Sequence, residues 1–178
     1  ASRVLITTHE KPDGDALGSS LALHRGLRQL GVSSHVLLAG PLDPNLLSVA
    51  GPDDDVRRFE HDGLPSAEDE PDVIAVVDTG AWTQLESTRT WLRERADRVI
   101  GVDHHAGGGS VASRRVVDVN CASATQALVP VLDALGVDLA LDEVATPLFL
   151  GLATDTGWFR FSSAGPEVYR VAARLMDA

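Results

Sequence analysis

Short aliphatic runs alternate with amphipathic stretches along this 178-residue chain. Near-continuous apolar runs bounded by turn residues are typical of strands that are buried on both faces of a parallel sheet. Leucines spaced three or four positions apart and followed by glycine are typical of helices. The pattern predicts strands at 4–6, 36–38, 73–77, 99–102 and 115–119, and helices at 17–30, 123–135, 142–153 and 165–176.

Two segments carry weaker signals. Residues 40–70 are rich in proline, aspartate and glycine, so we expect a loop with one short helix near 44–49. The stretch from 81 to 97 is predicted to be largely helical. Strands that alternate with helices predict an α/β fold, in which a mostly parallel sheet is covered by helices on both faces.

Composition and charge exclude several classes of protein. A hydrophobic content of 44% predicts a folded core, and the single cysteine rules out a disulfide scaffold or a cysteine zinc site. The apolar runs are too short to span a membrane and no signal-like segment opens the chain, so we expect a cytoplasmic protein. The net charge of −11 opposes binding of long nucleic acid through a broad basic face.

Acids and histidines follow three of the predicted strands. Because ligands bind at the carboxyl ends of the strands in an open parallel sheet, these side chains are expected to meet at one edge. A further carboxylate, in the segment 154–157 that we expect to be a loop, follows an apolar helix. The residues are His9, Asp13 and Asp15 after the first strand, Asp78 after the third, Asp103, His104 and His105 after the fourth, and Asp155.

This clustering predicts a metal site at the carboxyl ends of the strands. Several carboxylates gathered together need a counter-charge, and Lys11 and Arg160 are the only cations within the motifs. Oxygen ligands with one or two imidazoles suit Mn²⁺, with Mg²⁺ or Co²⁺ as alternatives. Six such ligands are too many for one ion with open positions, so we expect two ions about 3.5–4 Å apart that share a carboxylate.

Each motif also has a purely structural interpretation. Residues 13–15 could be a turn with a helix N-cap, residues 78–80 a strand-ending turn, and Asp155 a turn or a cap. His24 is expected to be solvated on the polar side of its helix. The adjacent histidines 104–105 are harder to explain by structure alone, and the occurrence of all these motifs after core elements favours a functional site.

Four stretches resemble, in order and spacing, the motifs of the DHH phosphoesterase superfamily. The branch resembled is the NrnA-like one, the nano-RNases and pAp phosphatases, through the stretch 151–161 and the triplet 123–125. The resemblance implies that residues 1–178 are the catalytic DHH domain. It also implies that a smaller C-terminal DHHA1-type domain, which usually supplies glycine-rich and basic segments, has no counterpart in this chain. The four stretches are His9-Glu-Lys-Pro-Asp13-Gly-Asp15-Ala-Leu-Gly18-Ser19, Asp78, Asp103-His104-His105 and Thr154-Asp155-Thr156-Gly157.

The resemblance further implies a role for each motif residue. His105 would contact the scissile phosphate or protonate the leaving oxygen, and Asp103 would orient an imidazole. Arg160 is a candidate phosphate contact, and Gly14 and Gly18 would let the backbone turn tightly beside the metals. The metal ligands would be His9 and Asp13 on one ion, Asp15, His104 and Asp155 on the other, and Asp78 as the bridge.

The expected function is a manganese-dependent phosphoesterase that hydrolyses short oligonucleotides or small nucleotides. Its substrates would be nano-RNA, pAp or linear or cyclic dinucleotides, attacked by a hydroxide that bridges the two ions. The same motifs also fit an inorganic pyrophosphatase or an exopolyphosphatase. A non-catalytic nucleotide-binding module is the alternative from a different class. The expected partners are the short nucleotide substrate and, with no membrane contact, a second copy of the chain as a homodimer.

Overall fold

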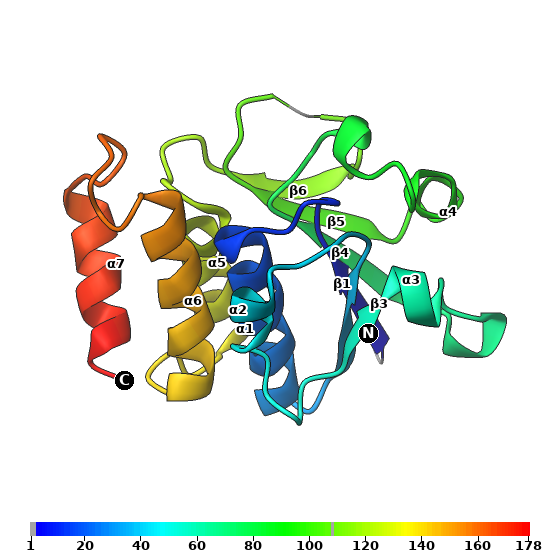
Figure 1. Cartoon of the computed structure of the whole chain (residues 1–178), viewed down its shortest axis with the longest axis horizontal. Coiled ribbons are helices and arrows are strands. Elements are labelled where there is room, and N and C mark those ends of the chain that lie inside the picture. The colour runs from blue at the N-terminus through cyan, green and yellow to red at the C-terminus, as the bar shows by residue number, and fades with distance from the viewer. Residues whose placement is uncertain (1–2, 108) are drawn as a thin grey trace.

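The computed structural model describes residues 3–107 and 109–178. One sheet of six strands has the order β3-β2-β1-β4-β5-β6, and every neighbouring pair is parallel. The α/β prediction is confirmed, because helices lie on both faces of this sheet (Figure 1). The strands are β1 (Arg3–Thr7), β2 (Ser33–Leu38), β3 (Val56–Arg58), β4 (Val73–Val77), β5 (Val99–Asp103) and β6 (Arg114–Val117).

The two faces of the sheet are covered unequally (Figure 1). The long helices and the short α2 form a layer on one face, where α7 packs outside α6, and only short helical segments cover the other. The first layer holds α1 (Gly14–Gln29), α2 (Pro44–Leu47), α5 (Ala124–Leu135), α6 (Asp142–Asp155) and α7 (Pro166–Met176). The second holds α3 (Phe59–Asp62), η1 (Ala67–Asp69), η2 (Trp82–Gln84) and α4 (Arg89–Arg93).

Alternate residues of the central strands enter separate hydrophobic cores. In β1, Ile6 packs in the core beneath α1, α5 and α6, whereas Leu5 packs in the core with Leu92 of α4. In β4, Val77 and Val76 divide in the same way. Both faces of these strands are therefore apolar, which is why they read as continuous aliphatic runs in the sequence.

The order of the strands places a switch point between β1 and β4. From β1 the chain moves outward through β2 to β3, then returns to β4 on the other side of β1 and continues to β5 and β6. Connections that leave adjacent strands in opposite directions open a crevice beyond the strand carboxyl ends, where ligands of such sheets bind. The loops after β1, β4 and β5 border this crevice.

The structure corrects several expectations. The region 40–70 contains β3 and α3 in addition to the short helix α2, and the stretch 81–97 holds only η2 and the five-residue α4. Helix α6 continues through Asp155, so the expected loop 154–157 begins inside a helix. His24 is buried, at 4% exposure, rather than solvated. In the described part of the chain, no helix is both long and apolar enough to cross a bilayer.

Candidate metal centre

The structure brings all six predicted metal ligands together at the carboxyl edge of the sheet. They come from the loop before α1, the first turn of α1, the ends of β4 and β5, and the last turn of α6. The possible ligand atoms of each group lie within 4.8 Å of one another. The groups are His9, Asp13 and Asp78; Asp15, His104 and Asp155; and Asp78, His104 and His105.

Asp78 lies between the two main groups. Its Oδ2 is 3.4 Å from Nε2 of His9, and its Oδ1 is 3.5 Å from Nε2 of His104. The residue has a left-handed backbone, with φ of 58°, a conformation that costs energy in a non-glycine residue and that clusters at functional sites. Oδ1 is buried and accepts no hydrogen bond from the described residues. A buried carboxylate oxygen without a donor fits a cation ligand.

Asp15 is held by the beginning of helix α5. The backbone N–H groups of Ala124 and Thr125 donate to its two carboxylate oxygens at 2.5 and 2.9 Å. These N–H groups are unpaired inside a helix at its first turn, so they are available to an anion. The side chain of Ser123 caps the same helix by accepting from the N–H of Gln126. Asp15 is therefore fixed in direction although it is only 1% exposed.

His104 presents its Nε2 atom to the carboxylates. Its Nδ1 lies 3.3 Å from the carbonyl oxygen of Cys121, which assigns the ring proton to Nδ1. Nε2 then lies 3.4 Å from Oδ2 of Asp155 and 3.9 Å from Oδ2 of Asp15. A histidine whose second nitrogen donates to a carbonyl is the usual form of a metal-ligating imidazole.

Asp103 holds the two histidines in place and does not join either main group. Its Oδ1 accepts from the backbone N–H groups of His104 and His105 and from Nδ1 of His105, at 2.8, 3.1 and 2.8 Å. Asp103 is buried, whereas the side chain of His105 is half exposed. The Nε2 atom of His105 is left without a partner among the described side chains.

Asp13 is both a helix N-cap and a possible metal ligand, so the structural and the functional interpretation of its motif are compatible. Its Oδ1 accepts from the N–H groups of Asp15 and Ala16, so it is the N-cap of α1. The same side chain belongs to the group with His9 and Asp78. One carboxylate can therefore begin the helix and still offer an oxygen to a cation.

Close packing of α1 against α6 brings Asp15 and Asp155 together. A Cβ atom on Gly18 would lie 2.4 Å from the carbonyl oxygen of Pro147, and one on Gly14 would lie 2.3 Å from Oγ1 of Thr154. The expectation of tight turns at these two glycines is wrong, because both are helical residues of α1. Their small size serves helix contact instead, since any side chain would push the two helices apart.

The pKa values show how crowded the charges are. Burial, and then the charge of Asp78, raise the pKa of Asp15 to about 7, although the N–H groups of Thr125 and Ala124 oppose the shift. Burial lowers the pKa of His104, but the contact of its Nε2 with Asp78 at 3.5 Å and the charges of the neighbouring carboxylates outweigh burial and raise this pKa to about 9. Within residues 3–107 and 109–178, no lysine or arginine pairs with Asp13, Asp15, Asp78 or Asp155.

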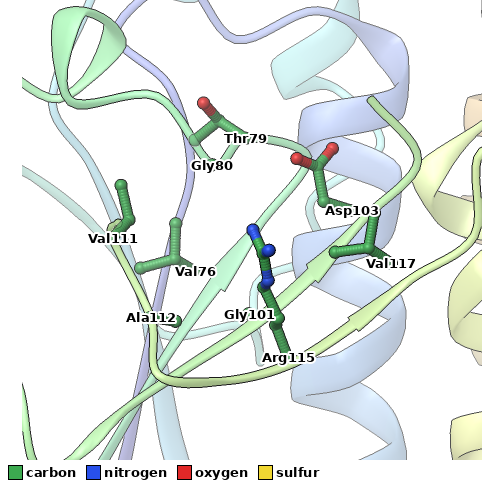
Figure 2. A pocket seen from close by; sticks show the side chains of 9 residues that line it. All are labelled: Val76, Thr79, Gly80, Gly101, Asp103, Val111, Ala112, Arg115 and Val117. Atoms are coloured by element: carbon green, nitrogen blue, oxygen red, sulfur yellow. The ribbon is translucent and has the colours of Figure 1, made fainter. Parts of the chain in front are cut away.

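Two basic residues near the edge do not join the metal groups. Nε of Arg160 donates to the carbonyl of Gly157 at 2.8 Å, and the side chain is exposed. The guanidinium of Arg115 projects from β6 into a small cavity below Asp103 and Thr79 (Figure 2). At about 10 Å³ this cavity holds about one water molecule at most, so it is too small for a nucleotide.

Sequence reasoning missed several parts of the site. The carbonyl of Cys121 and the N–H groups of Ala124 and Thr125 orient ligands through the backbone, which leaves no side-chain pattern. The serine N-cap at Ser123 was the available signal, because it marks where a helix exposes its N–H groups.

Comparison with known proteins identifies the family. The model of the DHH family, N-terminal domain, matches residues 3–152. The chain belongs to the DHH family. It is 37% identical over 177 residues to the bifunctional oligoribonuclease and PAP phosphatase NrnA of Thermus thermophilus, covering 97% of this chain and 49% of that protein. It is 28% identical to the probable bifunctional oligoribonuclease and PAP phosphatase NrnA of Streptococcus mutans, covering 97% of this chain and 52% of that protein.

These relatives confirm the NrnA-like branch of the DHH family, and this DHH chain spans about half of their length. Solved structures show the same fold. An exopolyphosphatase-related protein from Bacteroides fragilis has a TM-score of 0.85 at 24% identity, covering 99% of this chain and 52% of that one. A putative family II inorganic pyrophosphatase from Methanococcus jannaschii has a TM-score of 0.64 at 17% identity, covering 98% and 55%.

Proposed function

We propose that the protein carrying this DHH domain is a manganese-dependent phosphoesterase that hydrolyses short oligonucleotides or small nucleotides. The observation that carries the proposal is that Asp78 lies between the two ligand groups. Its Oδ2 is 3.4 Å from Nε2 of His9, and its Oδ1, which accepts no hydrogen bond from the described residues, is 3.5 Å from Nε2 of His104. The NrnA proteins of Thermus thermophilus and Streptococcus mutans, which bear oligoribonuclease and PAP phosphatase in their names, support the substrate class.

The donor set fits a pair of hard divalent ions. His9 and Asp13 would hold one ion, Asp15, His104 and Asp155 the other, and Asp78 both. Two such ions supply an activated water molecule and neutralise charge on the phosphoryl oxygens. The chain contributes the fixed directions of these ligands, because Asp15 is oriented by helix α5 and His104 by a backbone carbonyl.

The half-exposed His105 is suited to proton transfer. Nδ1 of this ring donates to Asp103, so Nε2 carries the lone pair and can accept a proton. Once protonated, His105 can contact a phosphate oxygen or deliver the proton to the leaving oxygen. Asp103 acts through His105, as a positioning residue. Arg160, whose terminal nitrogens have no partner among the described residues, remains our candidate for a further phosphate contact.

The division of the protein also follows from the proposal. Residues 1–178 would be the catalytic domain, and a basic DHHA1-type half of the cleft would lie outside them. The excess of acids in this domain agrees with that division, because a nucleotide needs cationic contacts that the net charge of −11 does not offer broadly.

A second candidate keeps the metal centre and changes the substrate to pyrophosphate or polyphosphate. This candidate is considered because the two solved structures share the fold of the chain. At identities of 24% and 17%, however, the similarity supports the fold and not the substrate. Comparing turnover of pyrophosphate with turnover of the dinucleotide pApA separates the two. A non-catalytic nucleotide-binding module is disfavoured, because such a module has no need for all six ligands.

Replacing the shared carboxylate tests the proposal. In the complete protein, Asp78→Ala should abolish Mn²⁺-dependent hydrolysis of pApA, whereas Asp97→Ala, at an exposed acid in the turn before β5, should not. Thermal unfolding gives a second measurement, because a ligand at 100 times its Kd stabilises a protein by about 2.7 kcal/mol. Mn²⁺ should raise the Tm of the wild type and of Asp97→Ala, but not of Asp78→Ala. Retained turnover in Asp78→Ala would contradict the two-ion assignment.

A further inference from the structure

A second hollow adjoins the metal centre on the His9 side. This cavity has a volume of about 190 Å³, and it is lined by His9, Glu10, Lys11, Thr83 and Gln84. It lies between the segment that follows β1 and the segment η2, which follows β4. Because His9 belongs to the group with Asp13 and Asp78, a molecule held at the metal centre from this side can extend into the hollow.

Lys11 brings an uncommitted positive charge to this hollow. It is the only lysine in the chain, it is exposed, and it makes no ion pair or hydrogen bond with the residues that the structure describes. Most basic side chains elsewhere are neutralised, as in the pairs of Arg95 with Glu70 and of Arg174 with Asp133. An unpaired ammonium group beside a site so rich in acids is available to an anionic ligand.

Two further donors line the same hollow. The hydroxyl of Thr79 accepts from the N–H of Ala81 and donates to Oε1 of Gln84. This contact fixes the amide so that both N–H donors on Nε2 of Gln84 are left without a partner in the described chain. The hydroxyl of Thr83 is likewise uncommitted among described residues. Three kinds of free donor therefore surround one cavity.

Glu10, the acid that lines the hollow, already accepts a hydrogen bond, and its contacts fix the backbone beside Lys11. The carboxylate of Glu10 accepts a hydrogen bond from the backbone N–H of Ser87. The backbone N–H of Glu10 donates to the carbonyl oxygen of Gln84 at 3.0 Å. Gly40 lies against the carbonyl of Glu10 so closely that a Cβ atom there would be 1.7 Å from the oxygen. The backbone next to Lys11 is therefore fixed, which reduces the entropy lost when its side chain binds a ligand.

We propose that this hollow is a subsite for a second phosphate group of the substrate, bound by Lys11 with Gln84 and Thr83. The inference rests on the proposed function and extends it. While one phosphate lies at the metal centre, a second phosphate of the same nucleotide is held on the His9 side. The preferred substrates are then nucleotides with two phosphate groups, such as a dinucleotide that carries a 5′-phosphate or a nucleoside bisphosphate.

Two dinucleotides with the same scissile bond provide the test. Hydrolysis by the complete protein is measured for pApA and ApA, which differ only in the 5′-phosphate. In Lys11→Met, the ratio of kcat/KM for pApA to that for ApA should fall about tenfold or more, because a charge-assisted contact is lost. The loss should lie in KM for pApA. Lys11→Arg should restore most of the ratio, and Arg170→Met, at an exposed surface pair, is the matched control.

Several outcomes would overturn the subsite. An unchanged ratio in Lys11→Met, or an equal loss for both dinucleotides, places Lys11 outside any second-phosphate site. If Lys11→Met weakens inhibition by inorganic phosphate but leaves the ratio intact, the hollow binds free phosphate and the proposal is wrong. Failure of the proposed function looks different, since the wild type would then hydrolyse neither dinucleotide. Calorimetric binding of pAp to wild type and Lys11→Met still tests the subsite in that case.

Discussion

Two clusters of buried charged side chains lie near opposite ends of helix α1, and their charges are compensated in different ways. Near the end of the helix, Arg25 and Asp54 form what we call the paired cluster. The guanidinium binds both oxygens of Asp54 and donates to the carbonyls of Val49 and Glu143. The N–H of Gly51 also donates to Asp54. Each charge therefore has its partner within the protein.

The metal centre at the first turn of α1 lacks such partners. Asp13, Asp15, Asp78 and Asp155 face the imidazoles of His9 and His104, and no lysine or arginine pairs with these acids in the described residues. The contrast appears in the pKa values: burial and a like charge raise that of Asp15, whereas Arg25 outweighs burial and lowers that of Asp54. A cluster whose negative charge the protein does not fully compensate is suited to bind an external cation. A cluster whose charges are paired within the protein is suited to stabilise the fold.

The largest expected effect comes from breaking the paired cluster. Arg25→Met should destabilise the protein by about 3–5 kcal/mol, because it leaves the carboxylate of Asp54 buried without a counter-charge. Urea unfolding in EDTA measures the free energy. The double variant Arg25→Met with Asp54→Leu should recover most of the loss. Asp155→Asn should cost far less in the same assay, because burial and the charges of Asp78 and Asp13 already raise the pKa of this carboxyl group and disfavour its ionised form. Equal losses in both clusters would contradict the comparison.

An intermediate effect is expected from separating α1 and α6. Gly18→Ala places a methyl group 2.4 Å from the carbonyl oxygen of Pro147, so the helices must move apart, at a cost of about 1–3 kcal/mol. Because the same contact sets Asp155 beside Asp15, the affinity for Mn²⁺ should fall as well. Calorimetric titration with Mn²⁺ measures this.

The control for Gly18→Ala is Gly165→Ala, where a Cβ atom meets no heavy atom within 4 Å. Because Gly165 is the N-cap of α7, where alanine is less favourable than glycine, the variant should lose at most about 1 kcal/mol of stability and keep the wild-type Mn²⁺ affinity. If Gly18→Ala lowers stability but keeps the full Mn²⁺ affinity, the metal centre does not depend on the contact between the two helices.

The smallest effect is a pH dependence of the paired cluster. The pKa of Asp54 lies below its unfolded value, so its contribution to stability is present above about pH 4 and is lost as the pH falls through the folded pKa. Each unit of that downward shift is worth about 1.4 kcal/mol. Unfolding free energies between pH 6 and about 3 should therefore fall less steeply in Asp54→Asn than in the wild type. Parallel curves would show that Asp54 does not gain from Arg25.

Much of the site could be predicted from sequence because it follows strand ends. The runs that became β1, β4 and β5 are aliphatic on both faces, and each leads directly into its acids and histidines. Parallel pairing then brings those ends to one edge without further information. Strand β3 was missed, since only three residues pair there and its single apolar side chain, Val56, gives no periodic signal.

Other features depend on contacts between distant segments. Asp155 could not be assigned to a helix, because the continuation of α6 depends on packing against α1 through Gly18 and Gly14. His24 is buried because Ser34 and Asp54 close over it, and neither is near it in sequence. The hollow beside Lys11 exists because η2 folds back against the segment after β1.

The sequence by itself determined the class of fold, the edge of the sheet that carries the chemistry, and the residue types that meet there. These follow from local hydrophobic pattern and from the single direction of parallel strands. Only the tertiary structure decided which carboxylate oxygens accept hydrogen bonds, which ring nitrogen of His104 faces the acids, and which polar atoms remain without a partner in the described chain. Those properties depend on distances of a few ångströms between segments far apart in the chain, and hydrogen bonding and close packing fix them only after folding.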